Sequence, residues 1–303
     1  LGFAPKGISL LVSASDFVML HEGLDREAPL FPDVCSRFGH AGNEQRQRQA
    51  WTNRQLRALI ANLRGSGVEV FGSVFAAYHR DRYHREWVSE HPELLPAYDR
   101  LGLTDGINVL GRLAGGAYYG DLFARQLVRV MQDYGFDGWH GADSMGPGGP
   151  LSCSDCSDAF MAQFAEYLGD RLPADWVRTT GHDPARLQQR MDAIWRDRWP
   201  EWCDFNADRW AAFWRGLVLA LRPLGKKTMM HSAGTKGAFE SLYSAGLDYR
   251  RMAALGVDYL VADTVAANLA LISGGRDRHF ELAAVLAEMK ALVPEMKVLF
   301  LHG

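Results

Sequence analysis

Short apolar runs alternate with longer amphipathic stretches along this chain. Between several of the runs, apolar residues recur three or four positions apart, which is the spacing of one helix face. The apolar runs predict seven strands, at residues 8–12, 68–75, 107–113, 136–143, 227–231, 257–263 and 297–301. The amphipathic stretches predict helices at residues 51–63, 121–134, 158–171, 184–197, 207–221 and 281–292.

This alternation of strand and helix is typical of a parallel sheet with helical crossovers. A chain of 303 residues is long enough for one closed barrel of eight strands and eight helices. The fold class that we expect is therefore α/β, a TIM (β/α)8 barrel over residues 1–303. Residues 144–206 would form a helical insertion after its fourth strand, and the eighth strand is expected beyond residue 303.

Composition and net charge bear on whether the protein binds nucleic acid or a membrane. Apolar residues make up 48% of the chain and charged residues 23%, and the formal net charge is −3. These values predict a folded protein without the charge that nucleic acid or membrane binding requires. No apolar run reaches the roughly 20 residues that span a bilayer. We therefore expect neither a nucleic acid nor a membrane as partner.

The four cysteines carry a weak signal. Cys153 and Cys156 have the spacing of half a zinc site, but a structural zinc site needs four ligands. Cys35, Cys203 or a histidine would have to complete it. We expect ordinary thiols or a local disulfide here, and predict neither a metal nor a cofactor.

The most informative segment is FDGWHGADSMG, at residues 136–146. A short apolar strand there leads to Asp143 and then into a loop rich in glycine and proline. Active sites of TIM barrels are built where the strands end. Asp263 ends the strand at 257–263, and alternation places it with Tyr259 on the face that fills the barrel. Two carboxyl groups on non-adjacent strands are what glycoside hydrolysis requires.

Several of these segments resemble one enzyme family. The run Asp137-Gly-Trp-His140 followed by Asp143-Ser-Met-Gly146 resembles the nucleophile strand of glycoside hydrolase family 66, the dextranases and cycloisomaltooligosaccharide glucanotransferases. Trp87 with His91-Pro-Glu-Leu-Leu95 looks like the segment after strand two of that family. The strand at 257–263 is similar to the one that carries the family's acid/base, where a glutamate stands at the place of Asp263.

A broader resemblance links the chain to the retaining α-glycosidase barrels of families 27, 31 and 36. These carry an aspartate nucleophile on strand four and an aspartate acid/base on strand six, which suits Asp143 and Asp263. The resemblance implies a retaining glycoside hydrolase that cleaves an α-linked polysaccharide or oligosaccharide through a covalent glycosyl-enzyme intermediate. It also favours a secreted or cell-surface location.

The chain departs from family 66 in one respect that bears on geometry. Gly141-Ala142 stands where the family has a single residue. A regular strand would then turn Asp143 to the face opposite His140, and His140 would point toward the helices. A bulge at Gly141 would restore the family's arrangement.

Other polar and aromatic side chains lie near the predicted strand ends and are candidates for binding a sugar. They are Asp16, Tyr78, His79, Asp137, Trp139, His140, His231 and His302.

Each candidate also has a structural interpretation. Asp143 and Asp263 could cap the helices that follow them, Asp137 could bind a backbone or an arginine, and Trp139 could belong to the core. Among other carboxylates, Glu240 is the main rival to Asp263 as the acid.

Two other classes of function remain open. One is a non-catalytic carbohydrate-binding barrel, in which the carboxyl groups of Asp143 and Asp263 would lie beyond roughly 10 Å from each other. The other is a metal-dependent hydrolase that uses His79, His231, His302 and the aspartates.

Overall fold

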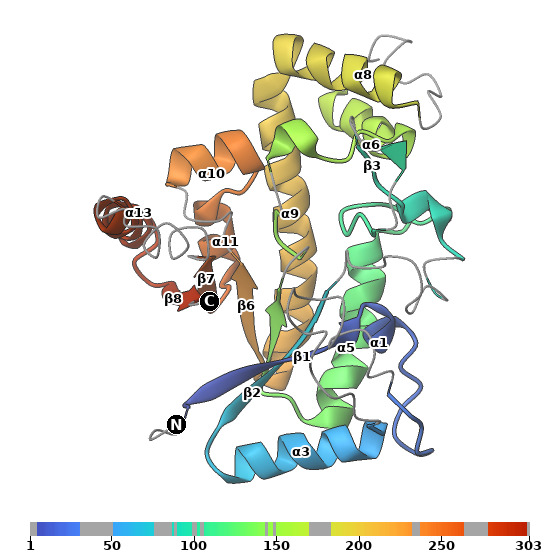
Figure 1. Cartoon of the computed structure of the whole chain (residues 1–303), viewed down its shortest axis with the longest axis vertical. Helices are drawn as coiled ribbons and strands as arrows, with labels where there is room; N and C mark the ends of the chain where they lie inside the picture. The colour runs from blue at the N-terminus through green and yellow to red at the C-terminus, as the bar shows by residue number, and fades with distance from the viewer. Residues whose placement is uncertain are drawn as a thin grey trace.

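A six-stranded parallel sheet organises the fold in the computed structural model (Figure 1). The model describes residues 5–30, 51–75, 87, 90–98, 102–103, 106–142, 145–147, 150–169, 183–231, 237–263 and 278–301. The strands follow chain order across the sheet: β1 (Gly7–Ala14), β2 (Glu69–Phe75), β5 (Gly138–Gly141), β6 (Lys227–His231), β7 (Tyr259–Asp263) and β8 (Lys297–Leu301). Within these residues the sheet is open, with β1 and β8 at its edges.

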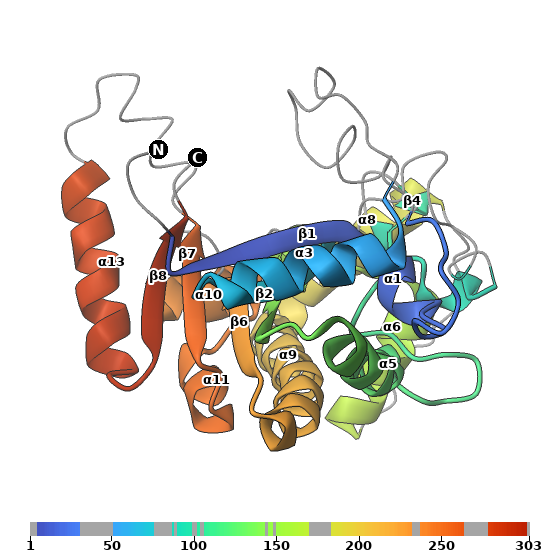
Figure 2. The same cartoon turned by 90° about the horizontal axis from the view of Figure 1, so that it is seen from below.

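Helices connect consecutive strands and cover one face of the sheet. They are α3 (Asn53–Gly65), α5 (Tyr119–Tyr134), α9 (Trp199–Leu221), α11 (Tyr249–Leu255) and α13 (Arg278–Leu292). Figure 2 shows α5, α9, α11 and α13 following one another around the curved sheet. Parallel strands in chain order with a helix after each are the repeating unit of a TIM barrel, while closure of the barrel stays a prediction.

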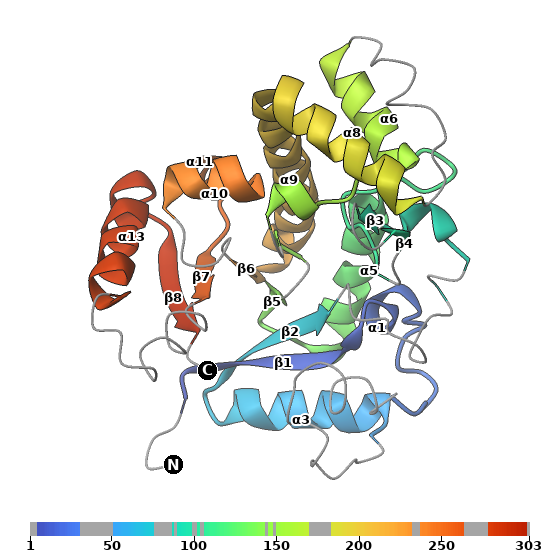
Figure 3. The same ribbon diagram turned by 45° about the horizontal axis from the view of Figure 1, so that its top comes forward.

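The remaining elements are short strands, 3-10 turns and further helices outside the set that connects the strands. They are α1 (Asp16–Met19), η2 (Pro92–Leu94), β3 (Ala97–Tyr98), β4 (Gly102–Leu103), η3 (Leu151–Cys153), α6 (Asp158–Leu168), α8 (Pro184–Asp197), η4 (Arg222–Leu224) and α10 (Ala238–Ala245). Strands β3 and β4 form an antiparallel pair of their own. Figure 3 shows α6, α8 and the start of α9 grouped at one end of the molecule.

Local sequence explains where the helices begin and end. Thr52 and Gln55 form a capping box at the start of α3: each side chain accepts a hydrogen bond from the backbone N–H of the other. Helix α5 ends at Gly135, which has a φ of 77°, a conformation that glycine adopts without a steric penalty. These signals are contained in a few neighbouring residues, which is why the predicted helices were found close to their observed positions.

Alternate side chains of the sheet divide between two faces. Val70, Trp139 and Leu260 belong to the main core, which packs against the helices. The fit is tight: a Cβ atom built on Gly141 would lie 2.6 Å from the Trp214 ring of α9. The opposite face carries a separate small cluster of Phe71, Met229 and Val261, with Tyr259 packed against it.

The predicted strand at residues 107–113 is not a strand of this sheet. The segment contains a turn in which the N–H of Leu110 donates to the side-chain oxygen of Asn108 (3.0 Å). The Asn108 amide also donates to Asp155 (2.6 Å). Asparagine that bonds its own backbone favours a turn over a strand. Strand β2 therefore pairs directly with β5.

This correction changes the strand count and one predicted boundary. Strand β5, predicted as the fourth strand of a barrel, is the third strand of the described sheet, and β7 is the fifth. Helix α9 starts at Trp199, so the predicted insertion at 144–206 ends inside a continuous helix. Among the described helices, none combines the length and apolar composition needed to cross a membrane.

Candidate functional site

The sheet order brings the ends of β5 and β7 to one edge. Both strands pair in parallel with β6, one on each side of it. Neighbouring strands lie about 4.8 Å apart, so these two strands lie roughly 10 Å apart. Asp263 is the last residue of β7, although its side chain lies outside the described part of the structure. Asp143 follows β5 shortly after Gly141 and lies outside the described residues as well.

Two histidines lie on the strands at this edge. The rings of His140 in β5 and His231 in β6 stack, with centroids 4.8 Å apart and an interplanar angle of 28°. Each residue is only 8% exposed. Nδ1 of His140 lies 2.8 Å from Oγ of Ser9 in β1, and Ser73 of β2 pairs with His140 in the strand register. These four residues form a polar cluster on the face opposite the helices.

Burial determines the charge of this cluster. Desolvation first, and the nearby His231 second, lower the pKa of His140 to about 3. His140 is therefore neutral at ordinary pH, and its ring carries one N–H donor and one acceptor nitrogen. Among the described residues, Nε2 of His140 and Oγ of Ser73 have no hydrogen-bond partner. Buried polar atoms are usually paired, so these two covered atoms leave hydrogen-bonding capacity unused beside the histidine pair.

The chain turns directly after His140. This turn bears on the direction of His140, which the extra residue at Gly141-Ala142 left open. The N–H of Ala142 donates to the carbonyl of His140 (3.0 Å), and the N–H of Met145 donates to the carbonyl of Ala142 (3.0 Å). Strand β5 ends at Gly141. Regular alternation therefore stops before Asp143, and His140 faces Ser9 and His231 rather than the helices.

The loop after β5 is anchored to its neighbours. The indole N–H of Trp214 donates to the carbonyl of Met145 (3.1 Å). Gly146 lies against the end of β6, since a Cβ atom built on it would lie 3.1 Å from the His231 carbonyl oxygen. Ala142 and Met145 are both buried. The chain on either side of Asp143 is therefore held at the ends of β5 and β6.

Asp137 lies at the opposite edge from the histidines, because it directly precedes β5. One of its carboxylate oxygens accepts from Nε of Arg64 (2.9 Å) and the other from the N–H of Val70 (2.9 Å). Its carboxylate joins β5 to β2 and α3. We leave Asp137 out of the candidate site, since binding a backbone and an arginine accounts for it.

Trp139 lies away from the polar cluster, whereas Asp16 follows the end of β1. Trp139 is fully buried on the helix side of β5, with its ring 5.7 Å from that of Phe123 in α5. No face of this ring is open to a sugar. Asp16 is buried in α1 and lies near Tyr119 of α5, where its charge adds to burial in raising the pKa of the tyrosine hydroxyl. Trp139 therefore serves the packing between the sheet and α5, and the role of Asp16 stays a prediction.

The other predicted site residues are not placed by the structure. Tyr78, His79 and His302 lie outside the described residues. Their roles stay predictions, as do those of Asp143 and Asp263.

Two cysteines are buried thiols. The Sγ atom of Cys156 donates to the Ala97 carbonyl (3.4 Å), and that of Cys203 to the Tyr243 carbonyl (3.2 Å). The side chain of Cys153 lies outside the described residues. In the described part of the chain, no three His, Cys, Asp or Glu side chains are grouped so that they could hold a metal ion.

Sequence reasoning missed Ser9 and Ser73. Each is a polar residue within an otherwise mostly apolar strand, at a position that faces away from the helices. That pattern is the signal that could have found the buried Ser73, because a polar side chain buried on a sheet needs a partner. Ser9 is exposed, so burial gave no such signal for it.

Comparisons with known proteins give only distant likenesses. No family model matches the chain, and no curated protein matches it. The resemblance to family 66 therefore stays a prediction.

Solved structures that are similar include three glycosidase-type proteins, each 13% identical in sequence. A chitinase from Chromobacterium violaceum ATCC 12472 has a TM-score of 0.42, with 80% of this chain and 52% of that chain covered. A protein described as a sporulation-specific glycosylase of Bacillus subtilis has a TM-score of 0.40, with coverages of 80% and 54%. A beta-galactosidase from the psychrophilic Marinomonas ef1 has a TM-score of 0.43, with coverages of 70% and 32%. The chain thus spans about half of the first two proteins and about a third of the last, and its function is argued below from its own residues.

Proposed function

We propose that this protein is a retaining glycoside hydrolase that acts on an α-linked polysaccharide or oligosaccharide. One observation carries the proposal: β5 and β7 both pair with β6. The segments that bear Asp143 and Asp263 therefore leave the sheet at the same edge. His140 and His231 lie at that edge as a buried polar pair.

The spacing of the strands suits the chemistry. A retaining enzyme needs its two carboxyl groups about 5–5.5 Å apart, whereas an inverting enzyme needs about 6.5–9.5 Å. Strand ends roughly 10 Å apart allow the retaining separation when the two side chains lean toward each other.

In the proposed reaction, the carboxylate of Asp143 attacks the anomeric carbon of the sugar. The carboxylic acid of Asp263 donates its proton to the glycosidic oxygen, which leaves with the first product. A glycosyl ester on Asp143 remains. The carboxylate of Asp263 then takes a proton from water, whose oxygen attacks the anomeric carbon and releases Asp143.

The histidines would bind the sugar and not transfer protons. A pKa of about 3 keeps His140 neutral, so it does not compete with Asp263 as the acid. We propose that a sugar hydroxyl bonds to its Nε2 atom or to the Ser73 hydroxyl, both of which are covered in the unbound protein and have no partner among the described residues. Losing such bonds should weaken binding more than it slows the chemical step.

Substitution of the two aspartates tests the proposal. The purified protein is first screened on dextran, pullulan, arabinan and galactan with product analysis. On the substrate that is cleaved, we expect Asp143→Asn and Asp263→Asn each to lower kcat by about 10²–10⁴-fold. Glu240→Gln is the control, because Glu240 is an exposed carboxylate of α10 and the main rival acid. The anomeric form of the first product, read by NMR, should be that of the substrate.

The opposite results are equally clear. Activity of Asp143→Asn within tenfold of wild type would refute the nucleophile, and loss of activity in Glu240→Gln alone would move the acid to that residue. Binding without hydrolysis of any polysaccharide would indicate a carbohydrate-binding barrel. Activity that a chelator abolishes would indicate a metal-dependent hydrolase.

A further inference from the structure

Four aromatic side chains form a continuous row where α8, α9 and α10 meet. The rings of Phe239 and Tyr243 in α10 are nearly parallel, at 13°, with centroids 5.5 Å apart. The Tyr243 ring lies 6.2 Å from that of Trp195 in α8. Trp195 in turn packs at 4.3 Å against Trp199, which begins α9. We call Phe239, Tyr243, Trp195 and Trp199 the aromatic row.

Three members of the aromatic row are open to solvent. Phe239 is 75% exposed, Trp195 52% and Tyr243 42%, whereas Trp199 is buried beneath them. Among the described residues, the exposed leucines lie outside the row: Leu20 follows α1, Leu219 is near the end of α9 far along the helix from Trp199, and Leu299 is in β8. The exposed part of the aromatic row is therefore made of aromatic rings, and none of the exposed leucines belongs to it.

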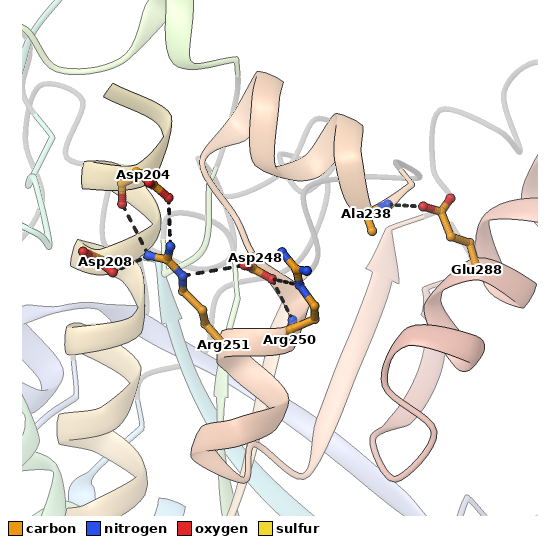
Figure 4. Close-up of polar contacts among 7 residues, drawn as sticks. All are labelled: Asp204, Asp208, Ala238, Asp248, Arg250, Arg251 and Glu288. Atoms are coloured by element: carbon orange, nitrogen blue, oxygen red, sulfur yellow. Dashed lines mark hydrogen bonds and ion pairs between the residues drawn. The ribbon is translucent and has the colours of Figure 1, made fainter. Parts of the chain in front are cut away.

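Hydrogen bonds from α9 and α13 hold the backbone of α10, which carries Phe239 and Tyr243. Sγ of Cys203 in α9 donates to the Tyr243 carbonyl (3.2 Å), which joins α10 to α9. A carboxylate oxygen of Glu288 in α13 accepts from the N–H of Ala238 (2.9 Å), next to Phe239, as Figure 4 shows. The backbone of α10 that carries Phe239 and Tyr243 is thus tied to α9 and α13, which reduces the backbone entropy lost on binding.

Figure 4 also shows the ion pairs that join α11 to α9. Arg251 of α11 pairs with Asp204 (2.8 Å) and with Asp208 of α9. Asp248 caps α11 by accepting from the N–H of Arg250 (2.9 Å). Helices α9, α10, α11 and α13 therefore form a connected support.

The row lies on elements that leave the same edge of the sheet as the candidate site. Helix α10 follows β6, whose last residue is His231, and α8 and α9 lie on the chain between β5 and β6. Figure 3 shows α8 and α10 at the same end of the molecule.

We propose that the aromatic row is a binding platform for a sugar chain, separate from the candidate catalytic site. The C–H faces of sugar rings are apolar and flat enough to stack on aromatic rings, while their hydroxyl groups stay in water. The exposed rings lie at more than one angle, with Trp195 inclined 69° to Tyr243. Neither these rings nor neutral sugar units carry a charge. The class of ligand rests on the proposed function, but the platform needs neither Asp143 nor Asp263.

The exposed area favours a sugar chain over a second copy of the protein. Aromatic side chains of this size cover 150–250 Å² each, so the exposed parts of the three rings amount to roughly 300–400 Å². A stable dimer buries about 800 Å² on each partner. The row is too small for that interface but large enough for a few sugar units.

Affinity electrophoresis tests the platform. Native gels contain dextran, pullulan, arabinan or galactan. Every protein tested carries Asp143→Asn, so that the polysaccharide in the gel is not cleaved. We expect at least one polysaccharide to retard the protein, and Trp195→Ala with Phe239→Ala to weaken that binding at least fivefold. Phe239→Ala alone should weaken it by about threefold and keeps the test valid if the double variant does not fold. Leu219→Ala is the matched control, with an exposed side chain on α9 outside the row.

The outcomes separate this proposal from the proposed function. Unchanged retardation of the row variants, or no retardation of the background protein by any of the four polysaccharides, would overturn the platform. So would light scattering that shows a dimer in the wild type and a monomer in the double variant. Full activity of Asp143→Asn would refute the catalytic assignment alone, and weaker retardation of the row variants in a polysaccharide that the protein does not cleave would still support the platform.

Discussion

His140 and His231 stack face to face on neighbouring strands, with ring centroids 4.8 Å apart. Both are buried, and a charge on either ring would be poorly solvated and would repel a charge on the other. The pair is therefore stable only when His140 is neutral. This relationship gives the candidate site one neutral polar ring, that of His140.

Substituting His140 should change how stability depends on pH. The pKa of this group is about 3 in the folded protein and 6.5 as an unperturbed histidine. Between these values only the unfolded chain binds the proton. The free energy of unfolding should therefore fall by about 1.4 kcal/mol per pH unit as the pH drops through this window. His140→Gln should remove this contribution, measured by urea unfolding between about pH 7 and pH 5. A difference between variant and wild type that stays constant over this range would contradict the burial of a neutral His140.

Gly138→Ala should destabilise the sheet at its most crowded point. A Cβ atom there would lie 2.5 Å from the Lys227 carbonyl oxygen and 2.5 Å from the Phe71 ring. The backbone oxygen cannot move away, so we expect a loss of about 1–3 kcal/mol in the free energy of unfolding. Gly65→Ala is the control, because a Cβ atom at the end of α3 meets nothing within 4 Å. Equal stability of the two variants would mean that β5 and β6 are packed less closely than described.

Asp137→Asn should lower stability without affecting catalysis. The carboxylate accepts from Arg64 and from the N–H of Val70, and the variant loses one acceptor and the charge. We expect a loss of about 1–2 kcal/mol in the free energy of unfolding, with kcat unchanged on the substrate that the wild type cleaves. If kcat fell while the unfolding curve stayed the same, Asp137 would return to the list of sugar contacts.

Much of the fold could be predicted because its signals are local. The apolar runs at 68–75, 227–231 and 297–301 became β2, β6 and β8 within a residue. Helix α8 was predicted at its observed bounds, since Asp183 caps it and Pro184 begins it. The run at 107–113 has a similar apolar content but is not in the sheet. Its conformation depends on Asp155, which is far away in sequence and binds the Asn108 side chain.

In the candidate site too, local patterns identified some residues, whereas others depend on contacts between distant segments. The pattern of an apolar strand ending in an acid picked out Asp143 and Asp263, and their roles stay predictions. His140 and His231 were found from the same strand ends, and the structure brings them together. Ser9 was missed because its contact with His140 joins β1 to β5 across the face of the sheet.

By itself, the sequence determined most of the segments that become strands and helices, because hydrophobic periodicity and capping residues act over one or two turns. It also determined that acids and histidines stand at strand ends. The tertiary structure alone decided the order of the strands and the face on which each side chain lies. That choice depends on a turn after His140, on Trp214 bonding Met145 and on the close packing of β5 against its neighbours. These contacts join residues that are distant in the chain, and no local pattern records them.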